Sequence, residues 1–273
     1  MRKGKATKYP IPHWSYSSLL SYLRNPLAWY KRYVERVYDM PSGPSAFIGK
    51  AGHTALQHYY GGMSPDASVA LGLESLRAVD DSEIEFGASG RTKKARREKR
   101  QHMEGEYLQA IGFYLAKAPK YKRIYGIEHS ATTQVPGLPL PIKAISDLVV
   151  ASPKRGHVDI VDHKFVESFS PLGADKPLFV LQAIFNYYTV QSSFNKPVAR
   201  FILQECRKRK NKDGSSQMRR YILDYKDYES DFEVFHRLVK EASAEIATRK
   251  SYLPNPSDMF EGKNSFDIYR LGL

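Results

Sequence analysis

The chain has 273 residues, 42% of them hydrophobic, which suffices for one large domain or for one domain carrying an insertion. Its 42 Lys and Arg outweigh 29 Asp and Glu, and the net charge of +13 favours a polyanionic partner. The only cysteine, Cys206, excludes an internal disulfide, and a single thiol cannot hold an iron–sulfur cluster or a structural zinc ion.

The first half of the chain predicts helices. Ser15 or Ser17 can cap a first helix, which Pro26 then restarts or kinks. A second helix is expected through AFIGKAGHTALQHYY (46–60), ending at Gly61 and Gly62. In chain order we expect a basic tail at 1–13, a single domain at 14–250 with a helical insertion at about 63–118, and a C-terminal tail at 251–273.

The middle of the chain predicts strands. A strand at 123–135 is followed by KAISDLVVAS (143–152) and HVDIVDHKFV (157–166), a plausible antiparallel meander. A helix is expected at about 177–191. Beyond it we expect a long hairpin with a basic tip at 207–214, and then a closing helix with Ser230 or Asp231 near its start. The fold class is therefore mixed α/β, with a central sheet flanked by helices.

Two of these strands carry charge in otherwise apolar sequence. Side chains alternate along a strand, so Asp162 and Lys164 share one face and His163 points to the other. A hairpin would bring Asp147 close to Asp162, and buried carboxylates need a cation or hydrogen bonds. Oxygen ligands of this kind suit Mg²⁺ or Mn²⁺, with Lys164 as a point charge for phosphate or water. A surface hairpin with an ordinary ion pair is the alternative.

Two helices hold further candidates. His53 is an imidazole that can ligate a divalent ion, with Gly49 one turn earlier allowing a close approach of the helix to another backbone. Gln182 and Asn186 are strongly polar residues on one face of an apolar helix. For His53 the alternative is a satisfied polar residue, and for Gln182 an interhelix hydrogen bond.

Basic residues are clustered along the chain, in segments that suit phosphate contacts. Each cluster alone could equally be a solubilising surface. Besides the N-terminal tail, the candidate DNA contacts are Arg91, Lys93, Lys94, Arg96 and Arg97, and Arg207, Lys208, Arg209 and Lys210.

Taken in order, these motifs resemble the PD-(D/E)XK nuclease superfamily, and within it the RecB-like branch that includes the CRISPR-associated exonucleases. The resemblance spans about residues 14–190. It rests on SYSSLLSYLRNPLAWYKRYV (15–34), IGKAGHTALQHYY (48–60), AISDLVV (144–150), VDIVDHK (158–164) and LQAIFNYY (181–188). It implies the restriction-endonuclease-like core of that superfamily.

The resemblance also implies roles for individual residues. The metal ligands would be His53, Asp147, Asp162 and the backbone carbonyl of His163, with Glu128 a weaker candidate through a bridging water. The catalytic residues would be Asp147, Asp162, Lys164 as the catalytic lysine, and Gln182, which would position the substrate strand or the lysine.

Several positions depart from the branch pattern. Ala144 stands where Gly is frequent, and Tyr187 comes one residue late after Gln182. Asn25 replaces the cysteine of the N-terminal Cys-Pro motif, and the C-terminal cysteines are missing. We therefore expect no iron–sulfur cluster.

The sequence thus predicts an Mg²⁺- or Mn²⁺-dependent deoxyribonuclease, first of all an exonuclease in recombination, repair or phage DNA processing. An endonuclease is one alternative. Another is a non-catalytic nucleic-acid-binding subunit of a recombination or CRISPR adaptation complex, and a recombination partner protein is possible. With no run of eighteen apolar residues and no signal-peptide pattern, a cytoplasmic location without membrane association is expected.

Overall fold

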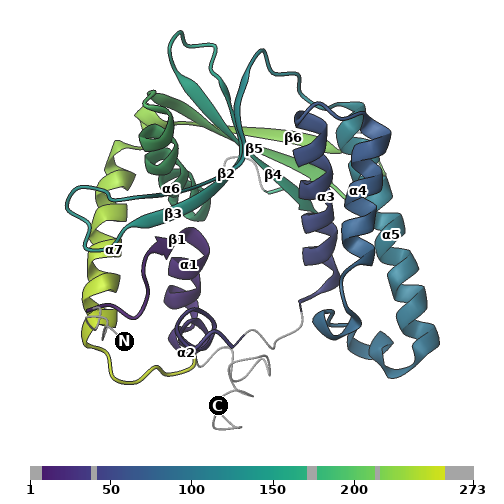
Figure 1. Cartoon of the computed structure of the whole chain (residues 1–273), viewed down its shortest axis with the longest axis horizontal. Coiled ribbons are helices and arrows are strands. Elements are labelled where there is room, and N and C mark those ends of the chain that lie inside the picture. The colour runs from purple at the N-terminus through teal and green to yellow at the C-terminus, as the bar shows by residue number, and fades with distance from the viewer. Residues whose placement is uncertain (1–7, 38–41, 171–176, 213–215, 256–273) are drawn as a thin grey trace, which may run out of the picture.

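The computed structural model describes residues 8–37, 42–170, 177–212 and 216–255. Within these ranges a mixed six-stranded sheet lies between two groups of helices (Figure 1). The predicted α/β fold with a central mixed sheet is confirmed. Parts of the predicted N-terminal tail (1–7), hairpin tip (213–215) and C-terminal tail (256–273) lie outside the described residues.

The elements follow the expected order. The described helices are α1 (Tyr16–Arg24), α2 (Pro26–Trp29), α3 (Pro44–Tyr60), α4 (Pro65–Arg77), α5 (Lys93–Ala116), α6 (Pro177–Phe194) and α7 (Glu229–Thr248). The described strands are β1 (Trp14–Ser15), β2 (Ile124–Thr133), β3 (Ile142–Ala151), β4 (Val158–Val166), β5 (Val198–Arg207) and β6 (Met218–Asp224). No helix in the described residues is both long and apolar enough to cross a membrane.

The helix boundaries have identifiable local causes. Ser15 caps α1 by accepting a hydrogen bond from the Ser18 N–H, and Asn25 caps α2 with Pro26 as its first residue. Both expectations for this region are confirmed. At the other end, α7 begins at Glu229, so Ser230 and Asp231 lie in its first turn, and no side chain caps it. Acidic residues there still favour the helix through its dipole.

The two larger of three hydrophobic clusters in the described residues lie on either side of the sheet. One joins α1, α2, α6 and α7 to the sheet and includes the stacked pair Trp14 and Trp29. The other joins α3, α4 and α5 to β4 and β5 and includes Tyr107 and Tyr114. Residues 63–118 are therefore helical as expected, whereas their status as an insertion into a single domain stays a prediction.

Helix α3 approaches β4 closely, at a position other than the one expected. A Cβ on Gly52 would lie 2.2 Å from the Phe165 ring, so a side chain there would push the helix off the strand. A Cβ on Gly49 would meet nothing within 4 Å. The prediction of close approach at Gly49 was wrong because helical periodicity alone does not tell which small residue faces the sheet.

The central strands separate at one place, where the sheet forks. Strand β3 pairs along its length with the antiparallel β2, but with β4 only from Leu148↔Val161 to Ala151↔Val158. At its beginning, β3 instead pairs with β1, while β4 continues beside the parallel β5 to Val166. Beyond Leu148 and Val161, β3 and β4 diverge. We call this point the fork.

Candidate active site

The fork brings the two acids of the central strands together. Asp147 and Asp162 are the residues next to the last β3–β4 pair, Leu148↔Val161, and both are buried. The backbone N–H of His163 has no β3 partner at this point and donates to Asp147 Oδ2 at 2.6 Å. Because the N–H and C=O of a strand residue point to the same edge, the His163 carbonyl faces the fork as well.

A cluster of three possible metal ligands forms beside Asp147. His53 Nδ1, from α3, lies 3.5 Å from Asp147 Oδ2 and 3.7 Å from Glu128 Oε1 on β2. One ligand atom from each of these residues lies within 4.8 Å of the other two. The spacing is that of a site able to hold a divalent ion.

Glu128 reaches this cluster from an unusual backbone conformation. The pairs Ile127↔Leu148 and His129↔Ser146 place it opposite Asp147, and its φ is +46°. A non-glycine residue in this region costs about 1–3 kcal/mol and is often found at functional sites. From the sequence, Glu128 is only a weaker candidate than Asp162 for a metal ligand. The reason is that a strained backbone conformation leaves no pattern in the sequence.

On the other side of the fork, Asp162 is held by two donors. Lys164 Nζ lies 3.2 Å from Oδ1 and 2.9 Å from Oδ2, and Gln182 Nε2 on α6 donates to Oδ1 at 2.7 Å. Asp162 and Lys164 therefore share a face, as the strand alternation predicts. Gln182 contacts the acid rather than the lysine.

Charges at the fork depend on one another. Burial disfavours the imidazolium of His53, but the carboxylates of Asp147 and Glu128 outweigh it and raise its pKa to about 10. Burial likewise works against a charged Asp147, and His53 nevertheless keeps the pKa of this carboxyl low. For Asp162 burial prevails and raises the pKa. Without a metal ion, a proton on His53 balances the acids.

His163 points away from these residues into the core beneath α5. Its Nδ1 is 2.9 Å from the Tyr114 hydroxyl, and its ring stacks on Tyr60 at 5.8 Å. Burial lowers the pKa of His163 to about 4, so the ring is neutral. The contacts with Tyr114 and Tyr60 hold the side chain of His163, whose backbone lies at the fork.

A cavity of about 480 Å³ opens at the fork. Its wall includes His53, Glu128, Lys164 and the exposed side of α3 from Ser45 to Gln57. The Lys164 side chain is 36% exposed, so it is accessible from this space. A phosphate entering the cavity would meet the lysine and the ligand cluster together.

The other residues singled out near Gln182 have structural contacts. Asn186 accepts a hydrogen bond from the Ser146 hydroxyl at 2.7 Å and donates to the Gln182 carbonyl at 3.0 Å. Tyr187 packs against the rings of Tyr225 and Phe232. Neither lines the cavity. Ser146, which sequence reasoning missed, anchors α6 to the strand that carries Asp147.

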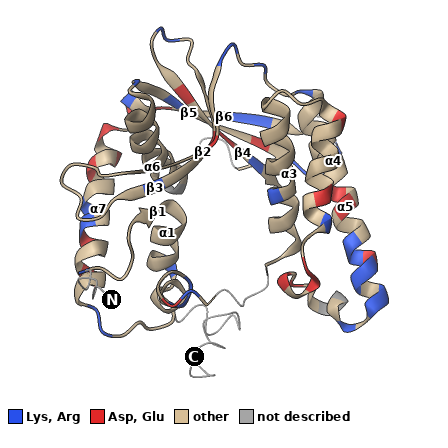
Figure 2. Ribbon diagram, viewed as in Figure 1, with Lys and Arg blue, Asp and Glu red and all other residues tan. Residues whose placement is uncertain are grey.

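The basic clusters differ in accessibility. Arg91, Lys93, Lys94, Arg96 and Arg97 are exposed at the beginning of α5 (Figure 2). Lys208 is only 1% exposed, and its ammonium lies 2.6 Å from Glu167 and 2.8 Å from the Ser45 hydroxyl. The prediction that Lys208 contacts DNA is therefore not supported, because its side chain is buried against Glu167 and Ser45 just beyond the end of β5. Arg207 is half-buried and donates to the Glu167 carbonyl and to Asn211, while Arg209 and Lys210 are exposed.

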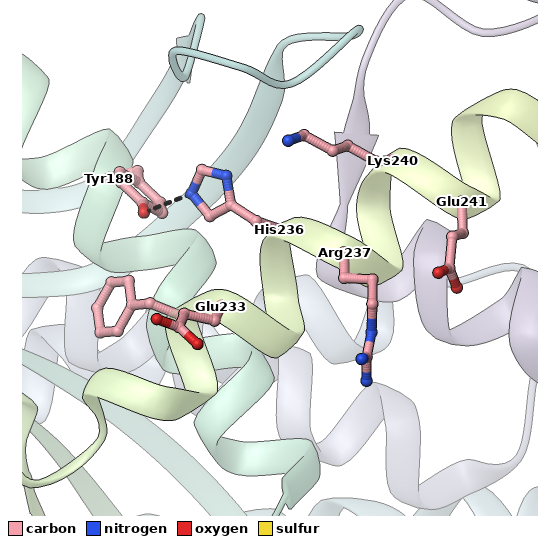
Figure 3. A pocket seen from close by; sticks show the side chains of 7 residues that line it. Tyr188, Glu233, His236, Arg237, Lys240 and Glu241 are labelled. Atoms are coloured by element: carbon pink, nitrogen blue, oxygen red, sulfur yellow. Dashed lines mark hydrogen bonds between the residues drawn. The ribbon is translucent and has the colours of Figure 1, made fainter.

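A larger hollow of about 650 Å³ lies elsewhere, on the outer side of α7 (Figure 3). Its charges are mixed, with Arg237 and Lys240 beside Glu233 and Glu241, and His236 pairs with the Tyr188 hydroxyl at 2.8 Å. It lacks converging carboxylates. The fork is therefore the better candidate for metal-dependent chemistry.

Comparison with known proteins agrees with the geometry. Residues 13–259, most of the chain, match the profile of the PD-(D/E)XK nuclease superfamily. The chain belongs to this superfamily. Its members are metal-dependent nucleases and phosphodiesterases, and the branch within the superfamily is not resolved.

Two other comparisons add little. No curated protein matches the chain. A solved structure titled "Crystal structure of SSO0001" is similar at 12% sequence identity, covering 91% of this chain and 84% of that chain with a TM-score of 0.31. A likeness of this degree carries no argument about function.

The donor set at the fork fits the divalent ion that PD-(D/E)XK nucleases use. Two carboxylates and one imidazole converge, and carboxylate oxygens suit Mg²⁺ and Mn²⁺. The observed cluster joins two predicted ligands, His53 and Asp147, with the weaker candidate Glu128, whereas the predicted ligand Asp162 is not part of it. Cys206 is buried in the core of α3, α4 and α5, where a single thiol provides no iron–sulfur site.

Proposed function

We propose that this PD-(D/E)XK protein is an Mg²⁺- or Mn²⁺-dependent deoxyribonuclease whose active site is the fork. The observation that carries the proposal is the meeting of a possible ligand cluster with an accessible lysine at one cavity. The cluster consists of His53, Glu128 and Asp147, and its members His53 and Glu128 line the same cavity as Lys164. A nucleic-acid substrate follows from the superfamily, and DNA from the resemblance of the motifs.

His53, Glu128 and Asp147 would hold the ion, with Asp162 and the His163 carbonyl at the edge of the same fork. When bound, a divalent ion supplies positive charge at the phosphate and lowers the pKa of water. The other catalytic roles belong to side chains of the protein. In hydrolysis a water oxygen bonds to phosphorus and loses a proton to solvent, the bond from phosphorus to the leaving sugar oxygen breaks, and that oxygen takes up a proton.

Lys164 is the proposed catalytic lysine. Burial opposes its charge, but the neighbouring Asp162 and Asp147 prevail and raise its pKa, so it stays cationic. Its ammonium would hold a phosphate oxygen or the attacking water and stabilise the charge that develops in the transition state. Gln182 would position the lysine indirectly, because it orients the Asp162 carboxylate that holds Lys164.

The finer assignment is an exonuclease of the RecB-like branch, acting in recombination, repair or phage DNA processing. The order of the five motifs along the chain supports the branch, and an exonuclease is our first choice within it. An endonuclease would use the same residues. The two are separated by the form of DNA that is cut.

The test uses end-labelled single-stranded and double-stranded DNA and a closed circle, each with Mg²⁺, Mn²⁺ or chelator. Wild type should cut linear DNA only with metal, and Lys164→Ala should lower the rate about 100- to 1,000-fold, as for loss of a transition-state donor. Lys226→Ala, on an exposed lysine paired with Asp224, is the control and should keep the wild-type rate. Cutting of the circle would make the protein an endonuclease.

Two results would overturn parts of the proposal. Unchanged cleavage by Lys164→Ala would show that the catalytic lysine is misassigned. DNA binding without cleavage in either metal would instead indicate a non-catalytic protein, or one that needs a partner.

A further inference from the structure

A second basic surface forms where three separate segments meet at one end of the sheet. The Ala151 N–H donates to the Arg123 carbonyl at 2.9 Å, which places the segment before β2 beside the end of β3. The Val158 N–H donates to the Pro197 carbonyl at 3.0 Å, which brings the α6–β5 connection to the start of β4. The β3–β4 turn lies between these contacts, near the top of the molecule in Figure 1.

Six cations gather there, and we call them the turn-end patch. They are Lys120, Lys122, Arg123, Lys154, Arg155 and Lys196. All are exposed except Lys196, which is half-buried. Among the described residues, none of the six has a carboxylate within 4 Å. Cations elsewhere on the surface, such as Arg77 and Arg100, are paired with acids.

An aromatic ring at the patch is covered by two of these cations. The Arg123 guanidinium lies 4.6 Å and Lys196 Nζ 5.6 Å from the centre of the Tyr125 ring. Phe194 packs on the same tyrosine. A cation over a ring is positioned without being neutralised by an opposite charge. Both therefore stay available to an anionic partner.

The patch differs from the basic cluster that begins α5. There Glu98 lies among the cations, Arg96 donates to the Gly90 carbonyl, and Arg100 pairs with Asp81. The turn-end patch has no acid in its three segments, 120–123, 153–156 and 195–197. Cations presented from separate segments suit a partner with repeated negative charges, and a nucleic-acid backbone is such a partner.

We propose that the turn-end patch binds the phosphate backbone of DNA outside the active-site cavity. The inference rests on the proposed DNA substrate and extends it to a second surface. Asp162 lies four residue steps along β4 from Val158, about 13 Å at ~3.3 Å per residue, and the patch lies beyond. DNA that fills only the cavity would not reach the patch.

The test compares two variants of equal charge. The patch variant carries Lys122→Gln, Arg123→Gln, Lys154→Gln and Arg155→Gln. The control variant carries Lys226→Gln, Arg237→Gln, Lys240→Gln and Lys250→Gln, four exposed cations on or near α7 that lie outside the turn-end patch and outside the predicted DNA contacts. Each loses four charges, from +13 to +9, so an effect of net charge alone is the same in both.

Binding of a labelled duplex of about 30 base pairs is followed by fluorescence anisotropy over a range of salt, with chelator present to prevent cleavage. The patch variant should bind more weakly than the control variant. Its slope of log affinity against log salt should be smaller than that of wild type by about 3 to 4, because each phosphate contact contributes roughly 0.9. Melting curves of both variants check that the fold is retained.

Equal affinities and equal slopes for the two variants would overturn the proposal. The proposed function is tested separately, since binding in chelator requires no catalysis. Cleavage of a very short oligonucleotide in Mg²⁺ should proceed at the wild-type rate in the patch variant. If wild type binds the duplex through the patch but cuts no DNA, the proposed nuclease activity is refuted. The proposed binding of DNA by the patch then stands.

Discussion

Strand β4 carries two buried carboxylates, three residues apart, with different surroundings. Asp159 is 1% exposed, lies where β4 pairs with both β3 and β5, and is paired with the Arg200 guanidinium on β5. Asp162 is 5% exposed, lies just past the fork, and is held by Lys164 and Gln182 beside a cavity. Burial of an acid in a strand is therefore no sign of catalysis. An open strand edge with an accessible cation distinguishes the second acid.

The largest expected difference between the two acids is in activity. Asp162→Asn removes the charge that holds Lys164 at the cavity, so the cleavage rate in Mn²⁺ should fall about 100- to 1,000-fold. Asp159→Asn should leave the rate within a few-fold of wild type at a temperature where both variants are folded. A matching loss of activity in the two variants would remove the distinction.

The second difference is in stability. Asp159→Asn leaves Arg200 with a weaker, neutral partner next to the core, at an expected cost of about 1–3 kcal/mol in the free energy of unfolding. For a chain of this size each kcal/mol lowers Tm by about 2–4 °C. Thermal unfolding measures the change, and Asp162→Asn should cost less because burial already disfavours the charge of Asp162 and raises its pKa. The comparison fails if Asp162→Asn is the more destabilised variant.

The smallest expected effect concerns the contact between the Tyr114 hydroxyl and His163, the residue whose backbone lies at the fork. Tyr114→Phe removes the hydroxyl that contacts His163, at an expected cost of about 1 kcal/mol in stability. Tyr107→Phe is a matched control on α5, because it loses a hydrogen bond to the Val69 carbonyl of α4 and none to β4. Both should lose similar stability, but only Tyr114→Phe should need more Mn²⁺ for half-maximal activity. An equal Mn²⁺ requirement in the two variants would make the Tyr114 contact merely structural.

Much of the fold can be predicted from the sequence because its signals are local. Period-two alternation places Asp162 and Lys164 on one face, and Ser15 and Pro26 mark helix starts. The order of the motifs then indicates the superfamily. These features depend on neighbouring residues, which the sequence displays directly.

The rest depends on contacts between distant segments. The position of the fork leaves no signal in VDIVDHK, because the pairing of β3 with β4 decides where the two strands separate. The strained backbone of Glu128, the burial of Lys208 and the close approach at Gly52 arise in the same way. The turn-end patch is also invisible in the sequence, since its cations come from three segments.

The central claim is that the fork holds a divalent ion, and Mn²⁺ binding to the whole chain tests it most directly. Calorimetric titration of wild type, His53→Ala and His58→Ala without DNA separates the fork from other sites, since His58 lies on the same helix outside the ligand cluster. We predict that wild type and His58→Ala bind Mn²⁺ alike and that His53→Ala binds about 10- to 100-fold more weakly. Equal Mn²⁺ affinity in all three proteins would contradict the claim.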